Sequence, residues 1–157
     1  MSVSRVQEYL TPWSLQDRIQ EFTVSSATVA EAAAAVGCEP ARIAKTLSFL
    51  VGDKAVLIVM AGDAKVDNAK FKAFFHQKAT MIPPERVPEL TGYTVGGVCP
   101  FALPEVASVY LDASLQRFET VFPSAGSSKS AVEMNTKELW QSTKAAGWVD
   151  VGKGYEE

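Results

Sequence analysis

The chain has 157 residues, of which 47% are hydrophobic and 21% charged, and its formal net charge is −3. This length suffices for one domain with its own hydrophobic core, so we expect a single domain over residues 1–157. The acidic balance argues against a DNA-wrapping protein, and no apolar run approaches the roughly eighteen residues of a membrane helix, so neither DNA nor a membrane is an expected partner.

The first part of the chain predicts a helical start followed by a hairpin. In chain order, the expected elements are a helix at 4–10, a strand at 18–24, an alanine-rich helix at 28–36, a turn at 41–44 and strands at 46–51 and 55–61. Thr28 and Glu31 have the spacing of a capping box, and Gly37 ends the helix that they begin. Gly52-Asp53 predicts the hairpin turn. The second hairpin strand is apolar throughout, so we expect it to be central and covered on both faces.

The rest of the chain predicts short strands separated by short helices. The expected elements are a helix at 67–75, a strand at 79–82, a helix at 83–90, strands at 106–111, 118–122 and 131–134, and a helix at 135–143 that begins with a capping box of Asn135 and Glu138. Phe71, Phe74 and Phe75 are expected to form one buried stripe. The tail after Trp148 is expected to be loosely held. Strands and helices that do not alternate strictly indicate the α+β class.

The segment Gly96-Gly97-Val98-Cys99-Pro100-Phe101 predicts a rigid loop. Two adjacent glycines tolerate positive φ and allow another backbone or a ligand to come close. The proline fixes one φ and restricts the residue before it. Apolar residues on both sides anchor the loop in a core. We therefore expect its backbone N–H groups to face a ligand oxygen, with a plain strand-connecting turn as the alternative.

Lys45 is the leading candidate for a functional side chain. It follows the expected turn at 41–44, at the junction with a strand, where an inward-pointing ammonium offers a fixed positive charge to a phosphate or an oxyanion. A lysine that extends along the surface into solvent is the alternative. Asp63, just after the apolar strand, is expected to orient a ligand hydroxyl, to pair with Lys45, or only to complete a turn.

Positive charge is concentrated in residues 42–78, which hold seven basic and three acidic residues, a balance of +4 that leaves −7 for the remainder. This window predicts a local phosphate-binding face on an acidic chain. A solvated surface without a ligand is the alternative.

Cysteine and histidine content limits the chemistry that is open to the chain. Cys38 and Cys99 form no Cys-x-x-Cys motif, and residues 1–8 lack a signal-peptide region, which together indicate a cytoplasmic protein. His76 is the one histidine, so a multi-histidine site is excluded and no metal or cofactor is expected. A Cys99–His76 dyad would make a thiol hydrolase, but we expect Cys99 to be a small side chain that lines a pocket.

Five segments together resemble one protein family in their order and spacing. They are Lys45-Thr46-Leu47, Ala61-Gly62-Asp63, Leu90-Thr91-Gly92-Tyr93, the loop at 96–101 and Ser124-Ala125-Gly126. The family is the YbaK/ProX family of aminoacyl-tRNA deacylases, related to the editing domain of bacterial prolyl-tRNA synthetases. The resemblance covers roughly residues 6–139, and the combination is far more specific than any single segment.

The resemblance implies a strongly curved, barrel-like mixed sheet flanked by short helices, with a pocket at its mouth. It implies hydrolysis of the ester between a mischarged amino acid and the terminal adenosine of a tRNA, by water that a ribose hydroxyl of the substrate assists. The implied catalytic residues are Lys45, Gly96 and Pro100. The implied substrate-binding residues are Asp63, Gly97, Val98, Cys99, Phe101, Ala125 and Gly126.

The implied partners are the acceptor end of a tRNA, foremost that for proline, and prolyl-tRNA synthetase, with the chain acting as a monomer or homodimer. A non-catalytic module that binds tRNA or a synthetase is the alternative function. Cys99, where many relatives have serine, and Ser127-Ser128, where relatives often have basic residues, depart from the family pattern. The amino acid therefore stays open among cysteine, alanine, serine and threonine.

Overall fold

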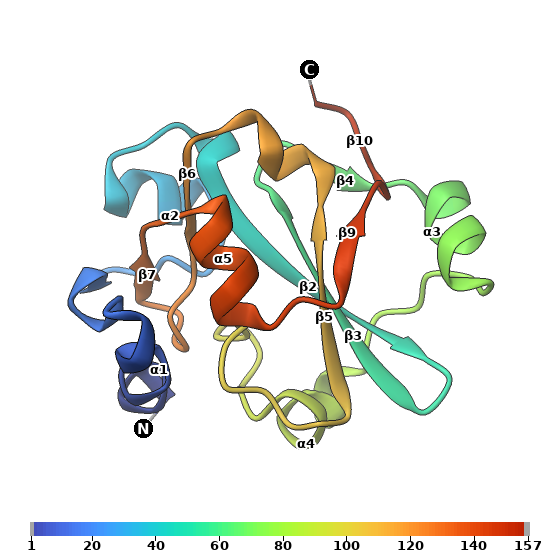
Figure 1. The fold of residues 1–157 in the computed structure, drawn as a ribbon, viewed down its shortest axis with the longest axis horizontal. Coiled ribbons are helices and arrows are strands. Elements are labelled where there is room, and N and C mark those ends of the chain that lie inside the picture. Colours follow the sequence, from blue (N-terminus) through green and yellow to red (C-terminus); the bar gives the residue numbers. More distant parts are fainter. Residues whose placement is uncertain (1, 156–157) are drawn as a thin grey trace.

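The computed structural model describes residues 2–155 as a curved mixed sheet flanked by short helices (Figure 1). Six strands lie in the order β8-β6-β2-β3-β5-β9. Their bounds are Ile43–Val51 for β2, Lys54–Ala61 for β3, Ala107–Asp112 for β5, Thr120–Pro123 for β6, Met134–Asn135 for β8 and Gly147–Val149 for β9. The predicted α+β class and strongly curved mixed sheet are confirmed, and the sheet is curled into a half-barrel.

The sheet is mixed because one central hairpin is extended on both sides by parallel strands. β2 and β3 pair antiparallel, whereas β6 runs parallel to β2 and β5 runs parallel to β3. Two small ribbons complete the strands. They pair β1 (Ile19–Glu21) with β7 (Ser130–Val132), and β4 (Lys65–Val66) with β10 (Gly152–Lys153).

The helices lie on both faces of the sheet (Figure 1). They are α1 (Ser2–Leu10), α2 (Val29–Val36), α3 (Asn68–Phe75), α4 (Val87–Thr91) and α5 (Thr136–Thr143), with 3-10 turns at Thr11–Trp13, Gln16–Arg18, Pro40–Arg42, Pro84–Arg86 and Ala113–Arg117. Both predicted capping boxes are present, and Gly37 ends α2 with a φ of 84°.

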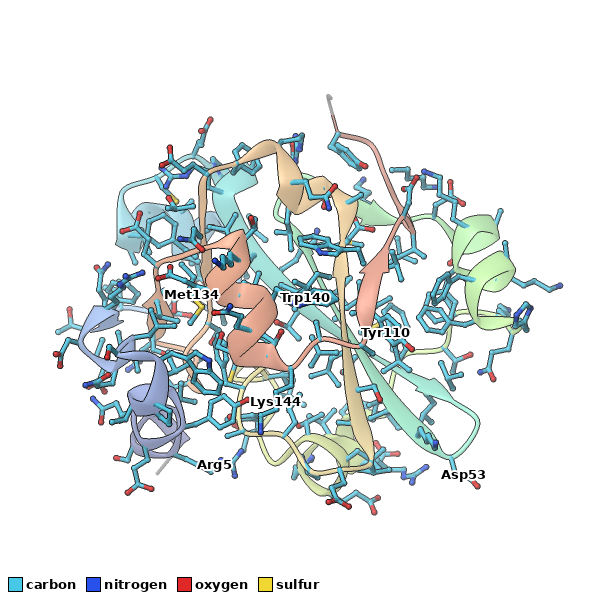
Figure 2. All side chains as sticks on the ribbon, in the orientation of Figure 1. Arg5, Asp53, Tyr110, Met134, Trp140 and Lys144 are labelled. Carbon is cyan, nitrogen blue, oxygen red and sulfur yellow. The ribbon has the colours of Figure 1, made fainter. Side chains whose placement is uncertain are left out.

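Strand β3 separates two hydrophobic clusters. Leu57 and Val59 face the cluster that α1, α4 and α5 cover, whereas Ile58 and Met60 face the cluster beneath α3. All four side chains are fully buried, as the apolar run predicts. The hairpin projects beyond these clusters, and Figure 2 shows Asp53 at its outer tip.

Apart from the start of β2, three predictions of local structure are wrong. No strand forms at 79–82, where the described chain makes one isolated bridge between Phe49 and Met81. Phe74 is 47% exposed, because the one-sided packing of α3 buries Phe71 instead. The tail is held in place within residues 149–155, since Val149 and Val151 are buried and the Val151 N–H donates to Asp112 Oδ1 at 2.9 Å; residues 156 and 157 lie outside the described part of the chain. Within residues 2–155, no helix has the length and apolar character needed to cross a bilayer.

Candidate active site

A cavity of about 420 Å³ lies along β2 and is called here the β2 cavity. Three residues on one face of the strand, Ala44, Thr46 and Ser48, line it together with Lys45. Its other lining residues are Ser26, Ala27, Met81, Ile82, Pro84, Val87, Val95, Gly96, Val98 and Ser124. The fold thus brings the lysine and the first glycine of the 96–101 loop to one cavity, although 50 residues separate them in the sequence.

Lys45 is the third residue of β2, because the strand begins earlier than predicted and leaves no helix–strand junction there. Its Nζ donates to the carbonyl oxygens of Gly62, at 3.4 Å, and of Ala64. An ammonium has three N–H donors, and no third acceptor is found among residues 2–155. Burial lowers the pKa of Lys45, and the nearby Asp63 carboxylate opposes that shift. The ammonium is therefore fixed in position with one donor left.

The 96–101 loop begins with a tight turn whose geometry depends on both glycines. The Gly97 N–H donates to the Thr94 carbonyl at 2.9 Å, and Gly96 occupies the third turn position with a φ of 89°. A Cβ at Gly97 would lie 3.3 Å from the Cα of Ser127, so the turn packs directly on the 124–128 loop. Among the described residues, the N–H groups of Gly96 and Val98 find no acceptor.

Tyr93 fixes the other end of the loop. Its hydroxyl donates to the carbonyl oxygen of Phe101, whose side chain is fully buried. Arg5 lies over the Tyr93 ring, 4.5 Å from its centre, and also donates to the Gly92 carbonyl at 3.3 Å. Helix α1 thereby holds the loop against the core, and Gly96 and Val98 of the loop line the β2 cavity.

Cys99 belongs to the hydrophobic core, so the expectation that it lines the pocket is wrong. The residue is fully buried, and burial raises the pKa of its thiol to about 11. His76 is exposed at the end of α3, on the opposite face of the sheet. The structure therefore assembles no Cys99–His76 dyad, and the thiol stays protonated at neutral pH.

Asp63 pairs with Arg117, and the alternative of a pair with Lys45 is not observed. Two hydrogen bonds of 2.6 and 3.0 Å join the carboxylate to the guanidinium, and this bonding holds the pKa of Asp63 below its usual value. Both residues line a second, more open cavity of about 470 Å³. Although it is the larger of the two, its Asp63 and Arg117 charges neutralise each other, whereas the residues that line the β2 cavity include Lys45 and no aspartate or glutamate.

The remaining predicted site residues divide into two groups. Gly97, Ala125 and Gly126 lie in the two loops that meet beside the β2 cavity, with Gly126 at a φ of 100°. Pro100 lines a third cavity, of about 290 Å³, with Tyr9 and Lys144. The structure therefore brings Lys45, Gly96 and Val98 to the β2 cavity and leaves Asp63, Cys99, Pro100 and Phe101 off its wall.

Sequence reasoning missed the polar wall of the cavity, which consists of Ser26, Thr46, Ser48 and Ser124. The period of two along β2 was a usable signal, since it places positions 44, 46 and 48 on one face. Ser124 lies in one of the five segments that resemble the family, whereas Ser26 had no such signal, because only the fold brings its loop to the cavity. Within residues 2–155, no group of three or more His, Cys, Asp or Glu side chains is placed to hold a metal ion.

Comparison with known proteins places this geometry in context. A model of the aminoacyl-tRNA editing domain family matches residues 23–141, a span that contains the whole lining of the β2 cavity. The uncharacterized protein YwhH of Bacillus subtilis (strain 168) is 48% identical in an alignment 157 residues long that covers 99% of this chain and 100% of that protein.

Solved structures agree with the fold. A crystal structure of a protein proposed to be a trans-editing enzyme for prolyl-tRNA synthetase matches with a TM-score of 0.87 at 31% identity, covering 98% of each chain. The crystal structure of hypothetical protein APE2540 matches with a TM-score of 0.83 at 30% identity, covering 95% of this chain and 99% of that one.

Proposed function

The chain belongs to the aminoacyl-tRNA editing domain family, and from this we propose that it hydrolyses the ester bond of a mischarged aminoacyl-tRNA. The observation that carries the proposal is that two residues of the β2 cavity wall are Lys45, whose ammonium is held by two backbone carbonyls, and Gly96, which lies in a hydrogen-bonded turn. The cavity volume of about 420 Å³ lies within the range of small-ligand sites, about 300–1,000 Å³.

The proposed reaction needs no protein nucleophile. The oxygen of a water molecule adds to the ester carbonyl carbon while a free ribose hydroxyl of the substrate assists the attack. The carbonyl oxygen gains negative charge, which the spare N–H of Lys45 and the N–H groups of the Gly96 turn stabilise. The bond from the carbonyl carbon to the ribose oxygen then breaks, and that oxygen takes up the proton that water gives. The products are the free amino acid and uncharged tRNA.

We propose the acceptor end of the tRNA for proline as the nucleic-acid partner. The similarity to a protein proposed to be a trans-editing enzyme for prolyl-tRNA synthetase supports this choice. The basic window at 42–78 includes Lys45 and Lys65, and the second of these is close enough to lower the pKa of the first. Such a local concentration of lysines fits the phosphates of a single-stranded end.

A deacylation panel tests the proposal. The purified chain is incubated with tRNA for proline that carries alanine, serine, threonine or cysteine, and the loss of the ester is followed over time. We expect hydrolysis of at least one of these substrates by the wild type. Lys45→Ala should lower kcat/KM about 10²–10³-fold, the typical effect of removing one oxyanion donor.

A matched control and a binding measurement sharpen the result. Lys54→Ala removes an exposed lysine at the start of β3, away from the cavity, and should leave the rate unchanged. Binding of uncharged tRNA by Lys45→Ala should remain measurable. If the wild type binds tRNA and hydrolyses none of the four esters, the chain is a binding module and the proposal is wrong.

A further inference from the structure

The ammonium of Lys45 depends on the segment 61–64, because the carbonyl oxygens of Gly62 and Ala64 accept its hydrogen bonds. Asp63 lies between these two acceptors in the sequence. Its carboxylate is close enough to oppose the effect of burial on the pKa of Lys45. The carboxylate is therefore a competing partner for the ammonium, within reach of the donor that the two carbonyls leave unused.

In the structure the Asp63 carboxylate binds Arg117 instead. The two hydrogen bonds, of 2.6 Å from Nη2 and 3.0 Å from Nη1, occupy both carboxylate oxygens. Within residues 2–155, no hydrogen bond or ion pair joins Asp63 to Lys45. A guanidinium matches a carboxylate with two parallel donors, whereas an ammonium meets it as a single point charge. The observed pairing is therefore the one that geometry favours.

The guanidinium of Arg117 is also held by groups other than this carboxylate. Its Nε donates to the carbonyl of Ser114 at 2.8 Å. The ring centres of Phe118 and Tyr155 lie 4.7 and 4.6 Å from its Cζ. The side chain is 18% exposed. These contacts fix the fork of the guanidinium in the orientation that the carboxylate meets.

Ser114 connects this arginine to the end of β3. Its hydroxyl accepts the Ala61 N–H at 3.0 Å, while its carbonyl accepts the Nε of Arg117. Its own N–H donates to the buried Asp112 at 3.0 Å. The segment that carries the two acceptors of the ammonium is thus attached to one support at its backbone and at its carboxylate.

We infer that Arg117 is a positioning residue for catalysis, which binds the Asp63 carboxylate and so keeps it from pairing with Lys45. This inference rests on the proposed deacylase function and assigns Arg117 a part in it. The third N–H of the ammonium then stays available to the ester oxygen that gains negative charge. Arg117 acts through the other two residues and does not touch the substrate.

A purely structural role of the Asp63–Arg117 pair leads to a different expectation. If the pair only braces the fold, removing both of its members should cost at least as much activity as removing the arginine alone. If Arg117 restrains the carboxylate, removing the carboxylate as well should relieve the loss. A double variant therefore distinguishes the two roles.

The first test measures kcat/KM on the mischarged tRNA that the wild type hydrolyses fastest. Arg117→Gln should lower kcat/KM at least about tenfold, because the ammonium then loses its free donor to Asp63. Adding Asp63→Asn to Arg117→Gln should recover most of this loss. Arg18→Gln is the matched control, since it breaks an arginine–carboxylate pair of 2.7 Å, with Glu138, outside the β2 cavity. Its kcat/KM should stay within about twofold of the wild type.

The second test does not depend on catalysis. Lysine labelled isotopically at Cε gives a resonance for Lys45, assigned by its absence from Lys45→Ala, which follows the protonation of the ammonium. The charged groups that act on this ammonium are Asp63 and Lys65. In Arg117→Gln the carboxylate approaches, so the resonance should titrate at a higher pH than in the wild type. In the double variant it should titrate at a lower pH than in the wild type.

The inference requires both results, relief of the kinetic loss in the double variant and the raised titration in Arg117→Gln. Absence of either one would overturn it, while the deacylase function would stand. If Arg117→Gln does not fold, Arg117→Lys keeps the cation without the fork, and Asp63→Asn should relieve its smaller loss in the same way. If the wild type hydrolyses none of the esters, the proposed function is overturned, and the titration still decides whether Arg117 separates Asp63 from Lys45.

Discussion

Gly62 packs against Pro40 so closely that a Cβ at position 62 would lie 2.1 Å from the Pro40 carbonyl oxygen. The same Cβ would lie 2.7 Å from Cγ1 of Val29. The carbonyl of Gly62 in turn accepts a hydrogen bond from Lys45. The absence of a side chain at this position therefore lets the backbone after β3 approach the turn at Pro40–Arg42 and hold the ammonium.

Gly62→Ala should destabilise the fold by about 2–3 kcal/mol, because the clash is with a backbone atom that cannot rotate away. Urea denaturation measures the change in the free energy of unfolding. Gly147→Ala is the control, since its Cβ would find only the Tyr110 ring at 3.8 Å, and a change within about 0.5 kcal/mol is expected. Equal stability of the two variants would show that the Gly62 contact is not tight in solution.

The activity of the wild type should begin to fall at a lower pH than expected for a lysine with an ordinary pKa. Burial lowers the pKa of Lys45 below 10.5, so the ammonium loses its proton, and the oxyanion its donor, as the pH rises toward that lowered value. Lys45→Arg keeps its charge throughout. Deacylation rates from pH 6 to 10, corrected for spontaneous hydrolysis, should show this decline in the wild type. The decline should be absent from the residual activity of Lys45→Arg, and an identical decline in both would assign it to another group.

Gly97→Ala should impair catalysis more than stability. Its Cβ would lie 3.3 Å from Ser127 Cα, so the loops at 94–98 and 124–128 must move apart by a few tenths of an ångström. Small displacements of positioning groups cost up to about 10²-fold in rate. We expect kcat/KM to fall at least about tenfold, with a loss of about 1 kcal/mol in the free energy of unfolding. If Gly97→Ala is less stable but keeps the wild-type kcat/KM, the substrate does not bind near this contact.

Asp63→Asn should remove a stabilising contribution that depends on pH. The Arg117 guanidinium holds the pKa of Asp63 below 3.8 in the folded state. The contribution is therefore complete above pH 3.8 and is lost as the pH falls through the lowered pKa. The side chains of Arg117 and Asp63 are 18% and 33% exposed, so solvent screening limits the contribution of the pair to the free energy of unfolding to about 1 kcal/mol.

Urea denaturation of wild type and Asp63→Asn between pH 2.5 and 7 measures this contribution. The stability difference should be constant near neutral pH and shrink in acid. Asp53→Asn, at the exposed hairpin tip (Figure 2), removes the same charge without such a partner. This variant should change the free energy of unfolding little over the whole pH range. A difference for Asp63→Asn that persists in acid would contradict the assignment to the ion pair.

Cys99→Ala should retain deacylase activity within about twofold, because the thiol lies in the core, and should lower the free energy of unfolding by about 1–2 kcal/mol. In the native protein at pH 8, iodoacetamide should modify the partly exposed Cys38 and spare Cys99, whose pKa is about 11. Both thiols should react in denaturant. If Cys99→Ala is well folded but inactive, the thiol takes part in catalysis and this prediction is wrong.

Local structure followed from the sequence wherever neighbouring residues decide it. The capping boxes of Thr28 with Glu31 and of Asn135 with Glu138, and the end of α2 at Gly37, all form where short-range hydrogen bonding predicts them. Lys45 and Gly96 stood out for the same reason, as a charge beside an apolar strand and a glycine pair before a proline. The family resemblance added the expectation that they act on one substrate.

Tertiary structure alone decided which of these residues meet. Alternation along β2 indicates that Thr46 and Ser48 share a face, but which segments lie opposite that face, with residues such as Ile82, Gly96 and Ser124, depends on the fold. Cys99 lies in the hydrophobic core and Asp63 pairs with Arg117. In both cases the contacting residues are distant in the chain and become neighbours only in the folded structure. Short-range geometry thus determined the elements, whereas burial and pairing depend on long-range contacts, which no local pattern encodes.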